Sequence, residues 1–145
     1  MDAGSLTLFM RLISLGSGSL LQYVSEAFPW SGDPAHTAVD RVGSIAAEER
    51  DAVARLTRLL QKKRMRLPTV GYPSHFTTIN FCSLDYLLPK LVADHEKEIA
   101  EIESRLGTAE DEEIRKLAQG YLDMKRGHLD ILKQLGASKP PADAA

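Results

Sequence analysis

Apolar residues recur at intervals of three and four along most of this chain, which is the period of a helix with one buried face. Four segments show this pattern, and runs of glycine, proline and polar residues separate them. The first covers about residues 5–28, the second starts near Asp33 and Pro34, the third starts at Ser83, and the fourth follows Gly107 and ends at Gly136. Thr108 is the expected N-cap of the fourth helix, since threonine is a common capping residue.

Two stretches interrupt the helical pattern. Residues 16–19, with the sequence GSGS, lie in the middle of the first predicted helix, where glycine is unfavourable by about 1 kcal/mol per residue. Either the helix breaks there, or the small residues allow another part of the chain to approach closely. Residues 67–81 contain two prolines and a glycine and are too long for a tight turn, so we expect an ordered crossover.

No segment shows the alternating pattern of a β-strand. The layout therefore predicts an all-α fold, an antiparallel four-helix bundle with one long crossover between the second and third helices. Residues 1–136 are expected to form a single domain. Residues 137–145 are expected to form a disordered tail, because they are polar, small or proline.

Composition narrows the possible functions. The net charge of −2 gives no reason to expect nucleic acid as a partner, which usually requires a basic surface. Cys82 is the single cysteine, so an internal disulfide and a thiolate metal cluster are excluded, and a reducing cytoplasm is expected.

The apolar N-terminal stretch starts with Asp2 rather than a basic cluster, and Arg11 interrupts it. We therefore expect a helix of a cytoplasmic protein, neither a signal peptide nor a membrane segment.

Three polar side chains fall on the predicted inward faces of three helices: Glu49 on the second, His95 on the third and His128 on the fourth. His95 fills the one gap in a regular apolar series: Leu84, Leu88, Leu91, Ile99, Ile102 and Leu106. A buried carboxylate or imidazole is unfavourable unless it is paired or bound to a metal. A carboxylate with two histidines suits iron, manganese or zinc, with Glu98 as a further candidate ligand. The alternative is a hydrogen-bonded pair of Glu49 with His95 or His128.

The stretches SLLQYVSEAFPW, AAEERDAVARLTRLL and KLVADHEKEIAEIESRL, together with the layout, resemble the ferritin-like superfamily, which includes bacterioferritins and rubrerythrins. The resemblance covers about residues 5–135. It implies two metal ions held by a carboxylate on each of two helices and a Glu-x-x-His pair on each of the other two. This chain departs from that pattern, because Gly16 and Ser19 stand where the first helix would supply a carboxylate. Ala52 follows Glu49 by three residues, and Lys125 precedes His128 by three, so both Glu-x-x-His pairs are broken.

These features predict a non-catalytic ferritin-like bundle with a vestigial metal site, which acts through assembly or partner binding. One alternative is a metal-binding protein with a reduced site built from Glu49, His95, His128 and Glu98. Another is a small-molecule carrier, in which residues 16–19 leave room for a ligand. We expect a homodimer, because the N-terminal helix is more apolar than the surface of a monomer requires. We expect His95 to face the interior at the level of Glu49 as a tolerated polar residue.

Overall fold

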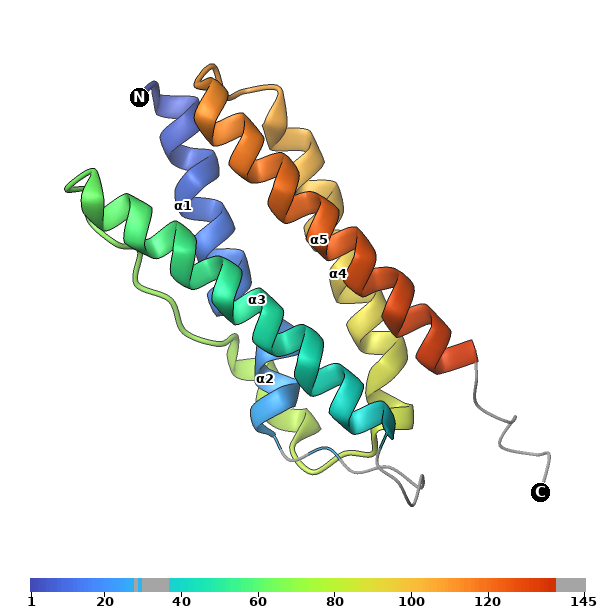
Figure 1. Cartoon of the computed structure of the whole chain (residues 1–145). Coiled ribbons are helices and arrows are strands. Elements are labelled where there is room, and N and C mark those ends of the chain that lie inside the picture. Colours follow the sequence, from blue (N-terminus) through green and yellow to red (C-terminus); the bar gives the residue numbers. More distant parts are fainter. Residues whose placement is uncertain (28, 30–36, 138–145) are drawn as a thin grey trace, which may run out of the picture.

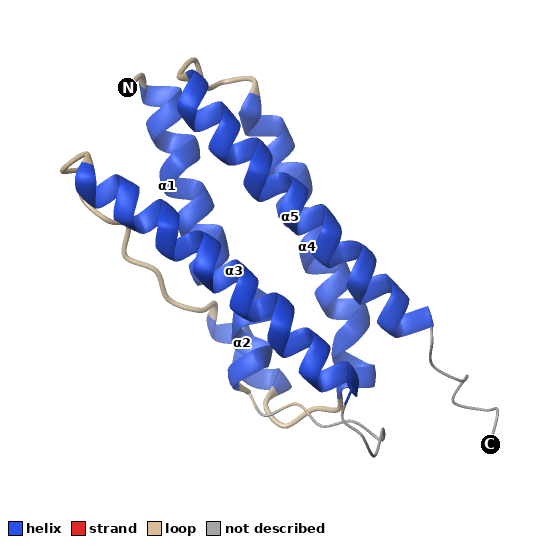
Figure 2. Cartoon of the chain, in the orientation of Figure 1, coloured by secondary structure: helices blue, strands red, loops and turns tan. Residues whose placement is uncertain are grey.

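The structure, a computed structural model, describes residues 1–27, 29 and 37–137. These residues form α1 (Ala3–Ser17), α2 (Leu20–Glu26), α3 (Thr37–Lys62), the 3₁₀ helix η1 (Ser74–Ile79), α4 (Leu84–Leu106) and α5 (Glu112–Ala137). The described residues contain no strand (Figure 2), so the all-α prediction is confirmed. The predicted helix start near residues 33–34 lies outside the described residues. The predicted tail, residues 137–145, also lies outside them except for Ala137, which is the last residue of α5 and not part of a tail.

The first predicted helix breaks at the GSGS stretch into α1 and α2. Gly18 is the C-cap of α1, and Ser19 is the N-cap of α2, where its hydroxyl accepts a hydrogen bond from the Gln22 amide at 3.2 Å. A Cβ atom on Gly16 would collide with Val53 and would lie 2.6 Å from the Tyr121 hydroxyl. Both expectations for this stretch are therefore met, because the helix breaks and its neighbours also approach closely.

The long helices lie alongside one another, and α2 continues α1 towards the opposite end of the molecule (Figure 1). The connection after α3 runs back along the molecule, so that α4 starts at the end where α3 also starts. Aromatic rings hold this crossover against α2: Tyr23 lies 5.1 Å from Tyr72 and 5.4 Å from Phe76, measured between ring centroids. The Tyr23 hydroxyl also donates to Asn80 at 2.5 Å. These contacts hold the crossover against α2, and Val70 and Gly71 of the crossover lie close to Gly18 at the break between α1 and α2.

The predicted cap of the last helix is wrong. α5 begins at Glu112, and Asp111 caps it by accepting a hydrogen bond from the Ile114 amide at 3.1 Å. Thr108 instead donates its hydroxyl hydrogen to the Arg105 carbonyl at 2.7 Å and closes the end of α4. Asp111 is favoured because the Ser5 hydroxyl accepts hydrogen bonds from the amides of Glu110 and Asp111, at 3.1 and 2.9 Å. This contact with α1 holds residues 110–111 outside the helix.

The core consists of two apolar clusters with a polar layer between them. One cluster contains Phe9, Leu12, Leu56, Ile102 and Leu122, among others. The second contains Leu21, Ile45, Leu84, Leu91 and Leu132, among others. Along each of α3, α4 and α5, the residues between these clusters include buried polar side chains. The break between α1 and α2 lies at the same level.

By length and composition, the stretch Ala3–Glu26 could cross a membrane, and half of its most apolar window is buried inside the protein. The buried core helix of a soluble protein meets the same criteria. The stretch is also interrupted at Gly18, and Ser19 and Gln22 make buried polar contacts with α3.

Candidate functional site

The polar layer is built from five buried side chains on three helices. They are Glu49 on α3, His95 and Glu98 on α4, and Lys125 and His128 on α5, none more than 5% exposed. Burying charged groups is unfavourable unless they are paired and hydrogen-bonded. The arrangement of partners within the layer therefore determines what the site can do.

Lys125 occupies the centre of the layer. Its ammonium forms a close ion pair with Glu49. It also forms an ion pair with Glu98, whose Oε2 lies 3.1 Å away, but the geometry of this second pair is not that of a hydrogen bond. Burial lowers the pKa of Lys125, but Glu98 and Glu49 more than offset this effect, so the pKa lies above its ordinary value. Lys125 therefore remains charged in the interior of the protein.

Glu49 receives hydrogen bonds from the start of α2. The Ser19 hydroxyl donates to Oε1 at 2.5 Å, and Nε2 of Gln22 donates to the same oxygen at 3.0 Å. Gln22 Nε2 also donates to the Ala46 carbonyl at 2.7 Å. Because α2 starts at the level of the layer, its first residues reach a carboxylate that a continuous helix would not cap. Sequence reasoning missed Ser19 and Gln22 as members of the site, although a serine after two glycines is a typical N-cap signal.

His95 is fully buried, as predicted, and lies in the same layer as Glu49. Its Nδ1 lies 3.1 Å from the Leu91 carbonyl oxygen, which only accepts hydrogen bonds, so Nδ1 carries the proton and Nε2 does not. Nε2 is buried and has no hydrogen-bond partner. Burial and the charge of Lys125 lower the pKa of His95 to about 2, so the imidazole is neutral.

His128 lies at the edge of the layer. Its Nε2 is 2.9 Å from a carboxylate oxygen of the exposed Glu48, and its buried Nδ1 has no hydrogen-bond partner. Burial lowers the pKa of His128, although Glu48 opposes this shift. The imidazole rings of His95 and His128 are 6.5 Å apart between centroids. The predicted pairing of Glu49 with a histidine is wrong, because Glu49 pairs with Lys125 while the histidines bond the Leu91 carbonyl and Glu48.

The structure brings the four candidate metal ligands, Glu49, His95, Glu98 and His128, into one layer. However, the Lys125 ammonium lies between the two carboxyl groups, where it would repel a dication. Within the described residues, no three His, Cys, Asp or Glu side chains are grouped so that they could hold a metal ion. The residues of the layer therefore do not fit the two-metal centre that the resemblance implies.

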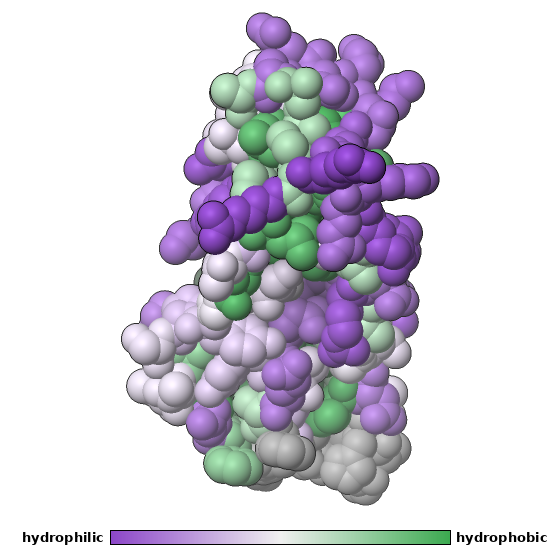
Figure 3. Space-filling view, turned by 90° about the vertical axis from the view of Figure 1, so that its left-hand side faces the viewer, coloured by the Kyte–Doolittle hydropathy of each residue, from purple (hydrophilic) through white to green (hydrophobic). Residues whose placement is uncertain are grey.

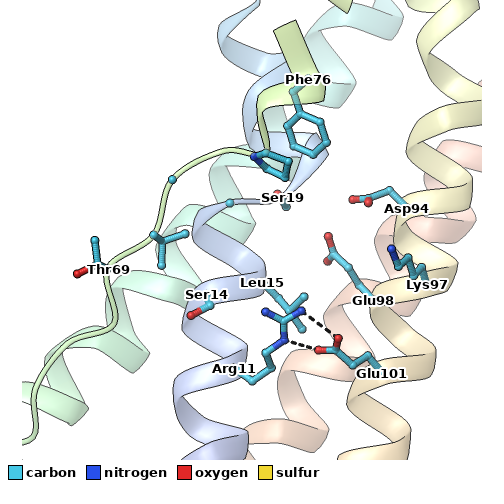
Figure 4. A pocket seen from close by; sticks show the side chains of 14 residues that line it. Arg11, Ser14, Leu15, Ser19, Thr69, Phe76, Asp94, Lys97, Glu98 and Glu101 are labelled. Carbon is cyan, nitrogen blue, oxygen red and sulfur yellow. Dashed lines mark hydrogen bonds and ion pairs between the residues drawn. The ribbon is translucent and has the colours of Figure 1, made fainter. Parts of the chain in front are cut away.

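A cavity of about 380 Å³ opens next to the polar layer, between the α1–α2 break, the crossover and α4 (Figure 4). Glu98 belongs both to the layer and to the wall of this cavity, and Ser19, which donates to Glu49 of the layer, also lines it. Arg11 closes one side by donating two hydrogen bonds to Glu101, from Nε at 2.5 Å and from Nη2 at 2.9 Å. The layer is thus accessible from outside through Glu98.

Comparisons of the chain with protein-family models, with curated proteins and with solved structures find no match.

Proposed function

We propose that this protein is a ferritin-like four-helix bundle without catalytic activity, which acts through assembly or partner binding. The observation that carries the proposal is the Lys125 ammonium between Glu49 and Glu98. Its charge balances one carboxylate, and burial raises the pKa of Glu98 well above its ordinary value, so the layer does not need a metal ion to balance its charge. The positive charge of Lys125 disfavours a dication beside Glu49 and Glu98, which argues against metal-dependent oxidation at this layer.

The arrangement of the helices supports the ferritin-like architecture. If α1 and α2 are taken as two halves of one broken helix, they complete a set of four with α3, α4 and α5. A long crossover before the third member of the set is typical of ferritin-like folds. The polar layer also supports it, because candidate ligands from three helices share one level in the interior.

A second copy of the chain is the partner that we propose. Several apolar side chains of α1, of the end of α3 and of the segment just after it are only partly buried within the chain: Leu6, Met10, Leu15, Leu59 and Met65. Figure 3 views the side of α3 and the crossover and shows apolar surface in its upper half, framed by hydrophilic side chains. Covering such a surface with the same surface of another copy would remove more apolar area from water.

Metal analysis tests the absence of a metal centre. We expect far less than one equivalent of iron, manganese or zinc in protein purified without chelator, and in protein incubated with each metal and then desalted. Two equivalents of tightly bound iron would contradict the proposal. One equivalent that disappears in His95→Ala, with a lower melting temperature, would favour a reduced metal site instead, because a bound metal stabilises the folded state.

A further inference from the structure

A groove of about 520 Å³ lies between α3 and α5, which run in opposite directions (Figure 1). Two contacts bridge these helices near the ends of the groove: His128 lies 2.9 Å from Glu48, and Lys63 lies 3.8 Å from Glu113. The bridges are 15 residues apart on each side, from 48 to 63 and from 113 to 128. Fifteen residues of helix span about 22 Å, so the groove is long enough for about four turns of a second helix.

The floor of the groove is apolar. Tyr121 is buried in it, while Leu59, Leu117 and Met124 are only partly buried. The backbone of α5 is open at Gly120, where nothing lies within 4 Å of an added Cβ atom. Another protein surface therefore has room to approach α5 closely, and covering the partly buried side chains would remove apolar area from water.

The charged side chains on the walls separate by sign along the groove. Glu48 and Asp51 lie in the half nearer the start of α3, and Arg55 and Lys116 lie in the half nearer its end; all four are exposed. In the described part of the chain, Asp51, Arg55 and Lys116 form no ion pair. Glu48 keeps its charge, because burial lowers the pKa of its partner His128 and favours the neutral imidazole. One half of the groove is therefore negative and the other is positive.

We infer that two copies of the chain associate through this groove, related by a two-fold axis that crosses it. Such an axis reverses the direction of the groove, so the negative half of one copy faces the positive half of the other. Asp51 then lies opposite Arg55 of the second copy, and Glu48 lies opposite Lys116. An axis along the groove would instead bring like charges together, which is unfavourable. The charge pattern thus selects one orientation of the two copies.

This inference rests on the proposed self-association and names the surface at the centre of the interface. Leu59 lines the groove and also belongs to the apolar surface of α1 and the end of α3, so the two surfaces are continuous. The groove adds a charge pattern to that apolar surface, and complementary charges fix how two partners are oriented.

Charge reversal on α3 tests the orientation. Asp51→Arg and Arg55→Asp each place like charges on both sides of the axis, so each should raise the dissociation constant of the dimer about tenfold or more. Both substitutions in one chain restore opposite charges across the axis and should bring the constant back to within about threefold of the native value. An equimolar mixture of the two single variants should form mixed dimers far more often than random pairing gives, because only the mixed dimer pairs opposite charges. Sedimentation equilibrium measures the constants, and native mass spectrometry counts the mixed dimers.

Two matched controls lie on α5. Asp130→Arg and Lys133→Asp make the same changes of net charge at exposed positions that do not line the groove, and they should leave the dimer unchanged. Circular dichroism verifies that every variant is folded. Dimers that are insensitive to charge reversal in the groove, or that the control substitutions weaken equally, would overturn the groove interface while the proposed self-association would stand. Protein that stays monomeric at high concentration would overturn both.

Discussion

Lys125 is the residue on which the interior depends most. A fully buried lysine is rare, and this one is retained because two carboxyl groups from α3 and α4 surround its ammonium. A buried ion pair adds little net stability compared with apolar residues of the same volume. Removing one partner is different, because the charge that remains is buried and uncompensated.

Lys125→Met should therefore lower the free energy of unfolding by about 3–5 kcal/mol, measured by urea denaturation. Methionine matches the lysine side chain up to Cε and lacks only the ammonium group, so most of the loss reports the charge rather than a cavity. The matched control is Lys133→Met on the same helix, an exposed residue paired with Glu96, and it should change stability by less than about 0.5 kcal/mol. Adding Glu49→Gln to Lys125→Met should recover part of the loss. A loss below about 1 kcal/mol would mean that Lys125 does not compensate Glu49.

His95 should make stability depend on pH. Its pKa in the folded protein is about 2, well below the ordinary value of 6.5, so below pH 6.5 the unfolded chain binds a proton that the folded protein does not. Stability is therefore lost as pH falls below about 6.5, by at most about 1.4 kcal/mol per pH unit from this group. Glu98 has the opposite effect, because its raised pKa makes the folded protein keep a proton that the unfolded chain releases as pH rises above 4.5.

His95→Gln isolates the contribution of the histidine. The difference in unfolding free energy between the native protein and this variant should increase with pH between about pH 5 and 6.5 and then become constant. Subtracting the two curves cancels the opposite effect of Glu98, which both proteins share. A flat difference for His95→Gln would mean that His95 is not buried as a neutral group.

At the scale of elements, the break between α1 and α2 connects the fold to the polar layer. Gly16, in the last turn of α1, allows Val53 of α3 and Tyr121 of α5 to pack against the helix backbone. The new helix start at Leu20 then directs Ser19 and Gln22 towards Glu49. An unbroken helix would have no capping residue at this level.

Gly16→Ala should destabilise the protein by about 1–3 kcal/mol, because the added methyl group collides with Val53 and lies 2.6 Å from the Tyr121 hydroxyl. Gly127→Ala in α5 is the matched control, since nothing lies within 4 Å of the added methyl group. That change should stabilise the protein by about 0.5–1 kcal/mol, the usual gain for alanine in a helix. Thermal and urea unfolding give both values. Similar effects of the two substitutions would show that α1 does not pack closely at Gly16.

At the scale of the whole molecule, the apolar surface of α1 predicts self-association. We expect light scattering coupled to size exclusion to give twice the chain mass of 16.0 kDa, with dissociation on dilution. The physical reason is that several apolar side chains are only partly buried within the chain, and the face in Figure 3 carries apolar surface in its upper half, which a second copy would remove from water. A single species of 16.0 kDa at high concentration would refute the dimer. Circular dichroism of the same sample verifies that the helices are intact.

Helical periodicity along the chain was enough to predict the all-α class, the positions of most helices and the inward direction of Glu49, His95 and His128. This succeeded because the interval between apolar residues is a local property that reports which face of a helix is buried. The same reasoning could not choose between Thr108 and Asp111 as the cap of α5. Both residue types cap helices well, and the choice depends on Ser5, which is more than 100 positions away.

Lys125 also lies on the inward face of its helix, four residues after Tyr121 and three before His128. The position of Lys125 in the sequence predicts that its side chain is buried. Its residue type predicts exposure, because a lysine usually extends its ammonium to water. Only the tertiary structure resolves this conflict, because it brings Glu49, 76 positions earlier in the chain, against the ammonium. The existence of the cavity beside Glu98 also depends on the tertiary structure, since its walls come from α1, the crossover and α4. The sequence alone determined which faces are buried; the packing of distant helices determined which charges meet.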